Sequence, residues 1–159
     1  SKKFKKISPL TLKIQSPKET GKTFSANSKL KVNYFSNFVD YPVISDDSGL
    51  CIKSLKNKPG IFSARLAKKH GGFKNAMKII LKKLKNKKDR SAFFVCSLSL
   101  KLPKKPPITV QGKVYGKISK KISGKNGFGY DPIFIPNKFN KTFGEIYKVL
   151  ILFLSFLKA

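Results

Sequence analysis

Two of the chain's few acidic residues stand side by side, in the stretch Ser45-Asp46-Asp47-Ser48-Gly49. The whole sequence of 159 residues contains only 7 Asp and Glu. A carboxylate pair beside a hydroxyl suits Mg²⁺, which takes one or two carboxylates and completes its shell with substrate phosphates. A metal-activated water can then attack phosphorus. The same residue types are also common in turns, so the doublet alone leaves a metal site and an ordinary turn both open.

A glycine-rich stretch at residues 124–134, Gly-Lys-Asn-Gly-Phe-Gly-Tyr-Asp-Pro-Ile-Phe, supplies a second set of groups. Phe128 or Tyr130 can stack on a nucleobase, and Asp131 can hydrogen-bond to it. The stretch is not a dinucleotide fingerprint, because its G-x-G-x-x-G pattern is incomplete. A loop with packing aromatics is the alternative. Together with the acidic doublet, the stretch predicts a nucleotide site.

Helices and strands must position these two stretches. Thr23 is a plausible N-cap for a helix that runs to residue 38. A short strand at 42–44 places the acidic doublet at its C-terminal end, where open α/β sheets bind ligands. A second strand follows from Leu50 to Leu55, with a turn at 57–60.

The second half of the chain shows the clearest periodicity. Apolar residues at helical spacing predict a helix over 73–86. Two strands are expected at 91–100 and 108–118, the latter with a bend at Gly112 or Gly116, and a helix-like segment begins near residue 142. These elements predict a single α/β or α+β domain with a mixed sheet.

The chain is strongly basic, with 35 Lys and Arg and a net charge of +28. This charge favours polyanionic partners, although all but Arg65 and Arg90 are scattered lysines, which is also typical of solvated faces. Cys51 and Cys96 lie in apolar stretches and are expected to be buried thiols in a reducing cytosol. His70, the single histidine, is expected in a surface loop. The apolar run at 149–157 is too short to span a membrane.

Five motifs, taken in order, resemble the inosine triphosphate pyrophosphatase family. They are Glu-Thr-Gly-Lys-Thr-Phe (19–24), Ile-Ser-Asp-Asp-Ser-Gly-Leu (44–50), Lys-Pro-Gly-Ile-Phe-Ser-Ala-Arg (58–65), the stretch at 124–134, and Lys-Thr-Phe-Gly-Glu-Ile (141–146). The stretch at 89–100 is also similar to the family's central strand. Five ordered motifs are far more specific than any one of them, and the resemblance covers roughly residues 17 to 146.

The resemblance implies one domain over residues 1–159, with a long mixed β-sheet and flanking helices that form two lobes around a nucleotide cleft. It implies a cytoplasmic homodimer that uses Mg²⁺ to hydrolyse ITP, dITP or XTP to the monophosphate and pyrophosphate. By motif, Asp47 is the catalytic carboxylate and metal ligand, Asp46 its partner at the metal, and Ser48 a substrate contact. The implied base pocket consists of Phe128, Gly129, Tyr130 and Asp131.

The sequence also departs from that family in three places. Nothing before Lys18 matches the family's phosphate-binding loop, and Ala26 stands where the family has a metal-site Glu. In the family's closing Ser-His-Arg motif, Ser155 can match the Ser, but Phe156 and Leu157 replace the His and Arg. Two alternatives therefore stay open: a catalytically impaired fragment of the family, or a lysine-rich protein that binds polyanions on the same fold. Nucleic acid is the less favoured partner, because phosphate recognition favours the arginine fork. No membrane partner is expected.

Overall fold

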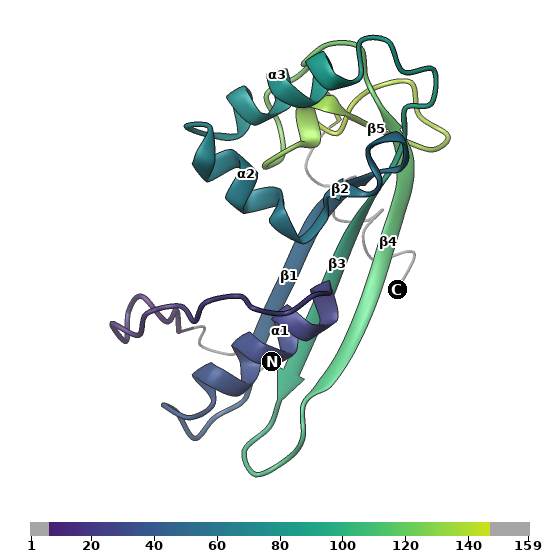
Figure 1. Cartoon of the computed structure of the whole chain (residues 1–159). Helices are drawn as coiled ribbons and strands as arrows, with labels where there is room; N and C mark the ends of the chain where they lie inside the picture. The colour runs from purple at the N-terminus through teal and green to yellow at the C-terminus, as the bar shows by residue number, and fades with distance from the viewer. Residues whose placement is uncertain (1–6, 147–159) are drawn as a thin grey trace. The chain divides into compact units, whose positions relative to one another are not determined.

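The structure, a computed structural model, describes residues 7–146 (Figure 1). Its helices are α1 (Phe24–Phe35), α2 (Ser63–Lys69) and α3 (Phe73–Lys83), and its strands are β1 (Val43–Ile52), β2 (Lys58–Pro59), β3 (Ser91–Lys101), β4 (Ile108–Ile118) and β5 (Phe134–Pro136). Short 3₁₀ turns lie at Lys53–Leu55, Gly60–Phe62 and Asp131–Ile133. Among these residues no helix is long and apolar enough to cross a membrane.

The strands form one sheet in the order β2-β1-β3-β4-β5. The β1–β2 and β4–β5 pairs are antiparallel. The chain divides into two compact units, which are described separately below: unit 1 comprises residues 7–47 and 97–110, and unit 2 comprises residues 48–96 and 111–146. The predicted α/β class, a long sheet with flanking helices, is confirmed.

In unit 1, α1 packs on the sheet through hydroxyl groups. Ser28 Oγ lies 3.1 Å from Ser97 Oγ and 2.8 Å from Ser99 Oγ, and Ser99 Oγ lies 2.7 Å from Thr109 Oγ1 on β4. Ser45 on β1 donates to the Ser28 carbonyl oxygen at 2.7 Å. These contacts identify the face of the sheet that α1 covers. The helix begins after Thr23 as predicted, and it ends at residue 35 instead of 38.

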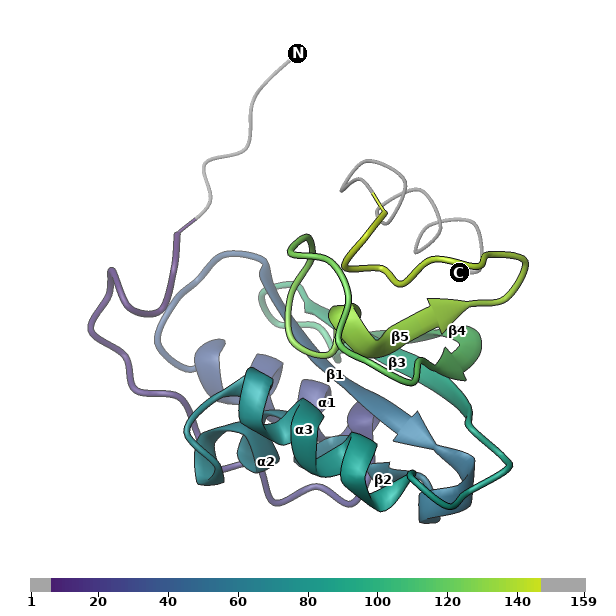
Figure 2. The ribbon, with the colours of Figure 1, turned by 90° about the horizontal axis from the view of Figure 1, so that it is seen from above.

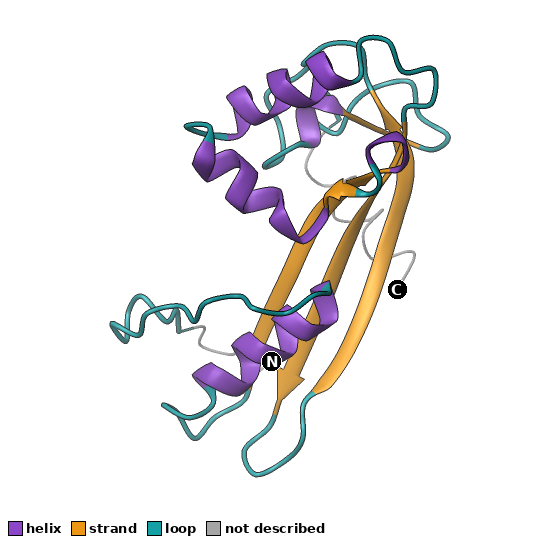
Figure 3. Ribbon diagram, in the orientation of Figure 1, coloured by secondary structure: helices purple, strands orange, loops and turns teal. Residues whose placement is uncertain are grey.

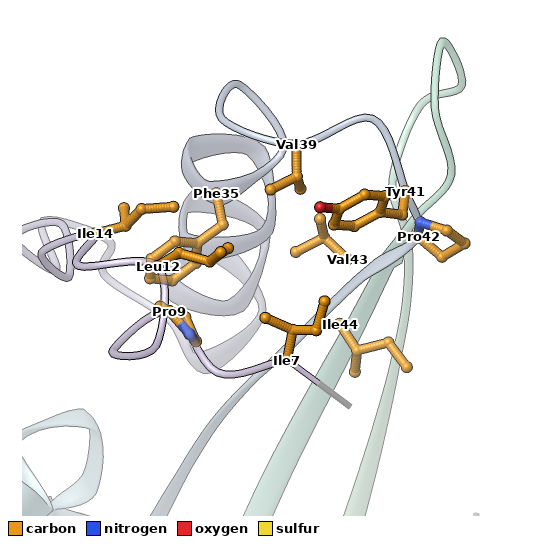
Figure 4. Close-up of a pocket in the computed structure, with 10 residues that line it drawn as sticks. All are labelled: Ile7, Pro9, Leu12, Ile14, Phe35, Val39, Tyr41, Pro42, Val43 and Ile44. Carbon is orange, nitrogen blue, oxygen red and sulfur yellow. The ribbon is translucent and has the colours of Figure 1, made fainter. Parts of the chain in front are cut away.

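The opposite face of the sheet in unit 1 is mainly apolar. Side chains alternate between the two faces of a strand, so the neighbours of Ser45, Ser97, Ser99 and Thr109 point away from α1. Those neighbours include the exposed apolar residues Ile44, Leu98, Ile108 and Val110 and the exposed Asp46. A mainly apolar cavity of about 420 Å³, to whose lining Ile44 also contributes, lies between the N-terminal segment, the end of α1 and the start of β1 (Figure 4).

The core of unit 2 forms where α2 and α3, which lie side by side (Figure 2), pack on the sheet. Its fully buried side chains include Leu50, Ile52, Ile80, Leu84, Ile118 and Phe134. The predicted helix over 73–86 is confirmed, with its end at Lys83. Arg90 links the end of α3 to the end of β4, because its guanidinium donates to the carbonyl oxygens of Leu84, Ile118 and Ser119.

Several sequence predictions were wrong. The acidic doublet does not follow a strand but lies inside β1, which continues to Ile52 as one strand (Figure 3). Pairing with neighbouring strands overrides the turn preference of Asp-Asp-Ser-Gly. Residues 53–55 form a 3₁₀ turn instead of a strand. β4 runs as one strand from Ile108 to Ile118, and the bend expected at Gly112 or Gly116 stays a prediction; at Gly116 an added Cβ would lie 2.9 Å from Pro136 Cα on β5.

The remaining expectations had mixed outcomes. Cys51 is buried, but Cys96 is exposed, because its position in β3 points away from the core. His70 follows the last residue of α2 and is half-buried. Residues 142–146 form hydrogen-bonded turns instead of the start of a helix. The apolar run at 149–157, with Ser155 and the other divergent positions near it, lies outside the described residues.

Candidate functional site

Asp47 is a buried carboxylate on β1, held by two residues of α1. Its side chain lies on the helix-covered face, and the residue is 7% exposed. Asn27 Nδ2 donates to Asp47 Oδ2 at 3.0 Å. Lys31 Nζ lies 4.0 Å from Asp47 Oδ1 and 3.0 Å from Glu19 Oε1. The carboxylate therefore has one firm hydrogen-bond donor and one nearby cation.

The local sequence explains this arrangement. Thr23 caps the helix by accepting from the Ala26 N–H at 3.1 Å, which fixes the first residue of α1. Asn27 and Lys31 are four residues apart and therefore lie on one side of the helix. The Gly21 N–H donates to Asn27 Oδ1 at 2.8 Å. Since this bond occupies the amide oxygen, it turns the amide nitrogen towards Asp47.

The surroundings raise the pKa of Asp47 above its ordinary value. Burial is the largest cause, and the negative charges of Glu19 and Asp46 act in the same direction. The hydrogen bond from Asn27 and the charge of Lys31 oppose this shift. A carboxylate with a raised pKa is a better proton acceptor, so Asp47 is the residue of unit 1 best suited to act as a general base.

The neighbours of Asp47 on β1 point the other way. Successive residues of a strand face opposite sides, and both Asp46 and Ser48 are exposed. Asp46 thus leaves the strand in the direction opposite to Asp47. In residues 7–146 no three His, Cys, Asp or Glu side chains are grouped as a metal site. One carboxylate with substrate phosphates still suits Mg²⁺, so the residues fit a metal that the substrate helps to bind.

In unit 2, the stretch at 124–134 forms a loop that presents one aromatic ring. The Phe128 side chain is 78% exposed. Gly127 and Gly129, on either side of it, have φ values of 76° and 66°, which favour glycine. Asp131 Oδ2 accepts from the Phe128 N–H at 2.7 Å, and burial raises the pKa of the Asp131 carboxyl. Asp131 thereby orders the loop that exposes Phe128.

Tyr130 belongs to the core instead of the surface of this loop. It is 2% exposed, and its hydroxyl donates to the Ser63 carbonyl oxygen at 3.0 Å. Burial raises its pKa to about 12. Phe73, the first residue of α3, packs edge-on against both rings, with centroids 5.0 Å from Phe128 and 5.2 Å from Tyr130. The exposed Phe128 therefore packs on the half-buried Phe73, which in turn packs on the buried Tyr130.

Comparison with known proteins identifies the family of this chain. A model of the Ham1 family matches residues 2–149. The chain belongs to the Ham1 family. A Clostridium tetani protein named dITP/XTP pyrophosphatase is 40% identical over 151 residues, which is 87% of this chain and 75% of that protein. A Treponema denticola protein of the same name is 43% identical over 133 residues, 82% of this chain and 69% of that protein.

Solved structures support the same assignment. The Staphylococcus aureus Ham1 protein superposes with a TM-score of 0.82 and 35% identity, over 94% of this chain and 83% of that one. A Coxiella burnetii HAM1 protein gives a TM-score of 0.85 and 33% identity, over 92% and 76% of the two chains. The fold predicted from the motifs is thus that of solved Ham1 proteins.

In this Ham1 protein the sequence analysis did not predict the residues that contact Asp47 and Phe128. Asn27, Lys31 and Glu19 surround Asp47, and Phe73 supports Phe128. The four-residue spacing of Asn27 and Lys31 after a capped helix start is the signal that indicates a shared face. Phe73 gave no such signal, because its position also fits an ordinary core residue of α3.

Proposed function

We propose that this Ham1 protein is a nucleoside-triphosphate pyrophosphohydrolase that converts dITP, XTP or ITP and water to the monophosphate and pyrophosphate. The family match and the relatives named dITP/XTP pyrophosphatase support the reaction class. The observation that carries the proposal is Asp47, a buried carboxylate with a raised pKa beside Asn27 and Lys31. Such a group suits proton abstraction from an attacking water.

The proposed chemistry assigns a role to each group around Asp47. The water oxygen forms a bond to phosphorus, the bond to the pyrophosphate leaving group breaks, and the water proton passes to Asp47. Asn27 keeps one carboxylate oxygen fixed, and Lys31 supplies positive charge for the phosphates. Phosphoryl transfer depends mainly on this kind of positioning and charge neutralisation.

Magnesium is part of the proposal. Mg²⁺ bound with the substrate would neutralise phosphate charge and favour ionisation of the water. Asp47 is the carboxylate offered to the ion, and Asp46 adds negative charge from the other face of β1. Ala26 supplies no ligand, so the phosphates would fill more of the coordination shell than in a site with a second acidic residue.

Base recognition is assigned to the loop of unit 2. The exposed ring of Phe128 can stack on a purine, while Gly129 and Asp131 shape the loop around it. Tyr130 supports that loop from the core through its bond to Ser63. Ser48, which is exposed on β1, remains a proposed substrate contact.

We also propose a homodimer in the cytoplasm. Ile44, Leu98, Ile108 and Val110 form an exposed apolar sheet face in unit 1, and such faces commonly mark interaction surfaces. Cys51 and Cys96 are unpaired thiols, which suits a reducing compartment. Sedimentation velocity of the wild type and of a Val110→Lys variant tests the dimer: the variant is expected to sediment as a monomer.

The test of the function is pyrophosphate release from dITP with Mg²⁺, compared for the wild type, Asp47→Asn and Asp46→Asn. We expect release by the wild type, a loss of at least about 100-fold in Asp47→Asn, and a smaller loss in Asp46→Asn. Equal release by Asp47→Asn and the wild type would refute the role of Asp47. No release by any folded protein would refute the proposed activity.

The lysine excess favours one other candidate function, binding of polyanions such as nucleic acid. The two candidates differ in their response to salt. Binding through many phosphate contacts weakens steeply with salt, whereas turnover of one bound nucleotide should weaken less. Titration of labelled single-stranded DNA at increasing salt, beside the pyrophosphate assay, separates them.

A further inference from the structure

Unit 2 contains a cavity that is separate from every group assigned above. It has a volume of about 390 Å³, within the range of small-molecule sites. Its apolar lining comes from three parts of unit 2: Leu55 and Pro59 before α2, Phe62 and Leu66 at and within the start of α2, and Ile79 and Ile80 on α3. Phe62 is 53% exposed. An apolar ligand body could therefore replace water against these side chains.

The rim of this cavity is cationic. Lys58 on β2, Lys69 at the end of α2 and Lys83 at the end of α3 line it together with Arg65. The residues that line it include no acidic side chain in the part of the chain that the structure describes. Arg65 stands over the Phe62 ring at 4.5 Å and donates to the Ile61 carbonyl oxygen, so it forms a wall, while the three lysines supply charge at the opening.

The positions of these lysines are only partly explained by the helices. Cations are favoured at helix C-termini, which accounts for Lys69 and Lys83. It does not account for Lys58, which comes from a strand, or for the apolar cavity that the three surround. The cavity in unit 1 differs from this one, because its lining residues are apolar apart from the hydroxyl of Tyr41 and include no charged side chain that could orient a ligand (Figure 4).

We propose that the cavity of unit 2 binds an amphipathic anion, with an aromatic or acyl body on the apolar floor and one carboxylate, sulfonate or phosphate among Lys58, Lys69 and Lys83. Charge complementarity selects this occupant. A second copy of the chain suits this cavity less well than it suits the apolar sheet face proposed for the dimer, because a partner with a net charge of +28 would meet three lysines at the rim, and like charges brought together are repelled.

The experiment uses two matched probes, 1-anilinonaphthalene-8-sulfonate and its uncharged analogue N-phenyl-1-naphthylamine. Fluorescence titrations are made with the full chain and with a Lys58→Met/Lys69→Met/Lys83→Met variant. Methionine keeps the apolar part of each side chain and removes the charge. We expect the sulfonate to bind the variant about tenfold more weakly, while the uncharged probe binds both proteins equally.

The control is a Lys117→Met/Lys120→Met/Lys121→Met variant, which loses the same net charge at exposed positions of unit 2. Equal weakening in the two triple variants would overturn the proposal, because general attraction to a basic protein would then explain binding. Unchanged sulfonate binding in the first variant would also overturn it.

A Leu66→Trp variant tests the location, because the larger ring fills the cavity and should weaken both probes. Nuclear magnetic resonance of the wild-type methyl groups provides the same test without a substitution.

Chemical-shift changes confined to the methyl groups of Ile79 and Ile80 on adding the sulfonate would support the site. Changes confined to Ile14 and Ile44 would place binding at the cavity of unit 1 and overturn the proposal. If sedimentation shows that sulfonate binding changes in parallel with the fraction of dimer, a second copy of the chain occupies the cavity and the proposal is overturned.

Discussion

Replacing Asn27 by leucine tests whether α1 tunes the proton affinity of Asp47. Asn27 is fully buried, and its Nδ2 donates to Asp47 Oδ2 at 3.0 Å. Leucine has a similar volume but no donor. Since the Asn27 hydrogen bond lowers the pKa of Asp47 while burial raises it, Asn27→Leu should raise that pKa further.

The size of the effect follows from the charge on the acceptor. Hydrogen bonds to charged groups contribute about 1.5–3 kcal/mol. At about 1.4 kcal/mol per factor of ten, the equilibrium between ionised and neutral Asp47 would shift roughly 10- to 150-fold towards the neutral form. Asp47 is 7% exposed, so water can replace the lost donor only in part.

The assay is pyrophosphate release from dITP as a function of pH. If ionised Asp47 is the base, the acid limb of the kcat/KM profile of Asn27→Leu should move to higher pH, and the rates should converge with those of the wild type at alkaline pH. Thr23→Ala is the control, since it removes the cap of the same helix at a cost of about 1 kcal/mol without touching Asp47. A profile for Asn27→Leu that is lower at every pH but unshifted would refute this reasoning.

Three further outcomes are expected. Burial raises the pKa of Asp47, so above that pKa the ionised carboxylate destabilises the folded protein. Asp47→Asn should therefore have a higher melting temperature than the wild type at pH 8, and the difference should shrink as the pH falls. A difference in melting temperature that stays constant with pH contradicts this. Arg90→Lys should lose two of three carbonyl contacts and about 1–3 kcal/mol of stability, measured by urea unfolding. Phe128→Ala should leave the melting temperature unchanged, since the ring is 78% exposed, and lower kcat/KM for dITP about 5- to 150-fold through lost stacking; equal kcat/KM would remove Phe128 from the base site.

The sequence predicted best where periodicity and burial agree. α3 has a strong apolar face, and β3 is rich in residues that favour strands, so both were placed within a few residues. The stretch from Ser45 to Gly49 was misplaced at a strand end, because turn-forming residue types say nothing about strands that pair beside them.

The predicted site was incomplete for a similar reason. Acidic and aromatic residues are recognisable by type, and this made Asp47 and Phe128 candidate site residues. Asn27 and Phe73 act only through contacts made in three dimensions. Residue type alone does not predict that the Gly21 N–H will bond to the Asn27 amide oxygen. It also does not predict that Phe73, at the start of α3, will pack against Phe128 in the loop at 124–134.

The hydroxyl contacts between α1 and the sheet bear on the motion of unit 1. Only Phe24 and Val32 are buried apolar residues of α1, whereas Ser28 meets Ser97 and Ser99 through oxygen atoms. Separating α1 from the sheet would expose little apolar surface, so the heat-capacity change of this local opening would be small. Local opening of α1 should therefore be easier than opening of α3, and its amide protons should exchange with solvent sooner. Asn27 and Lys31 sit on an element that can briefly release Asp47 to water while the core of unit 2 stays closed.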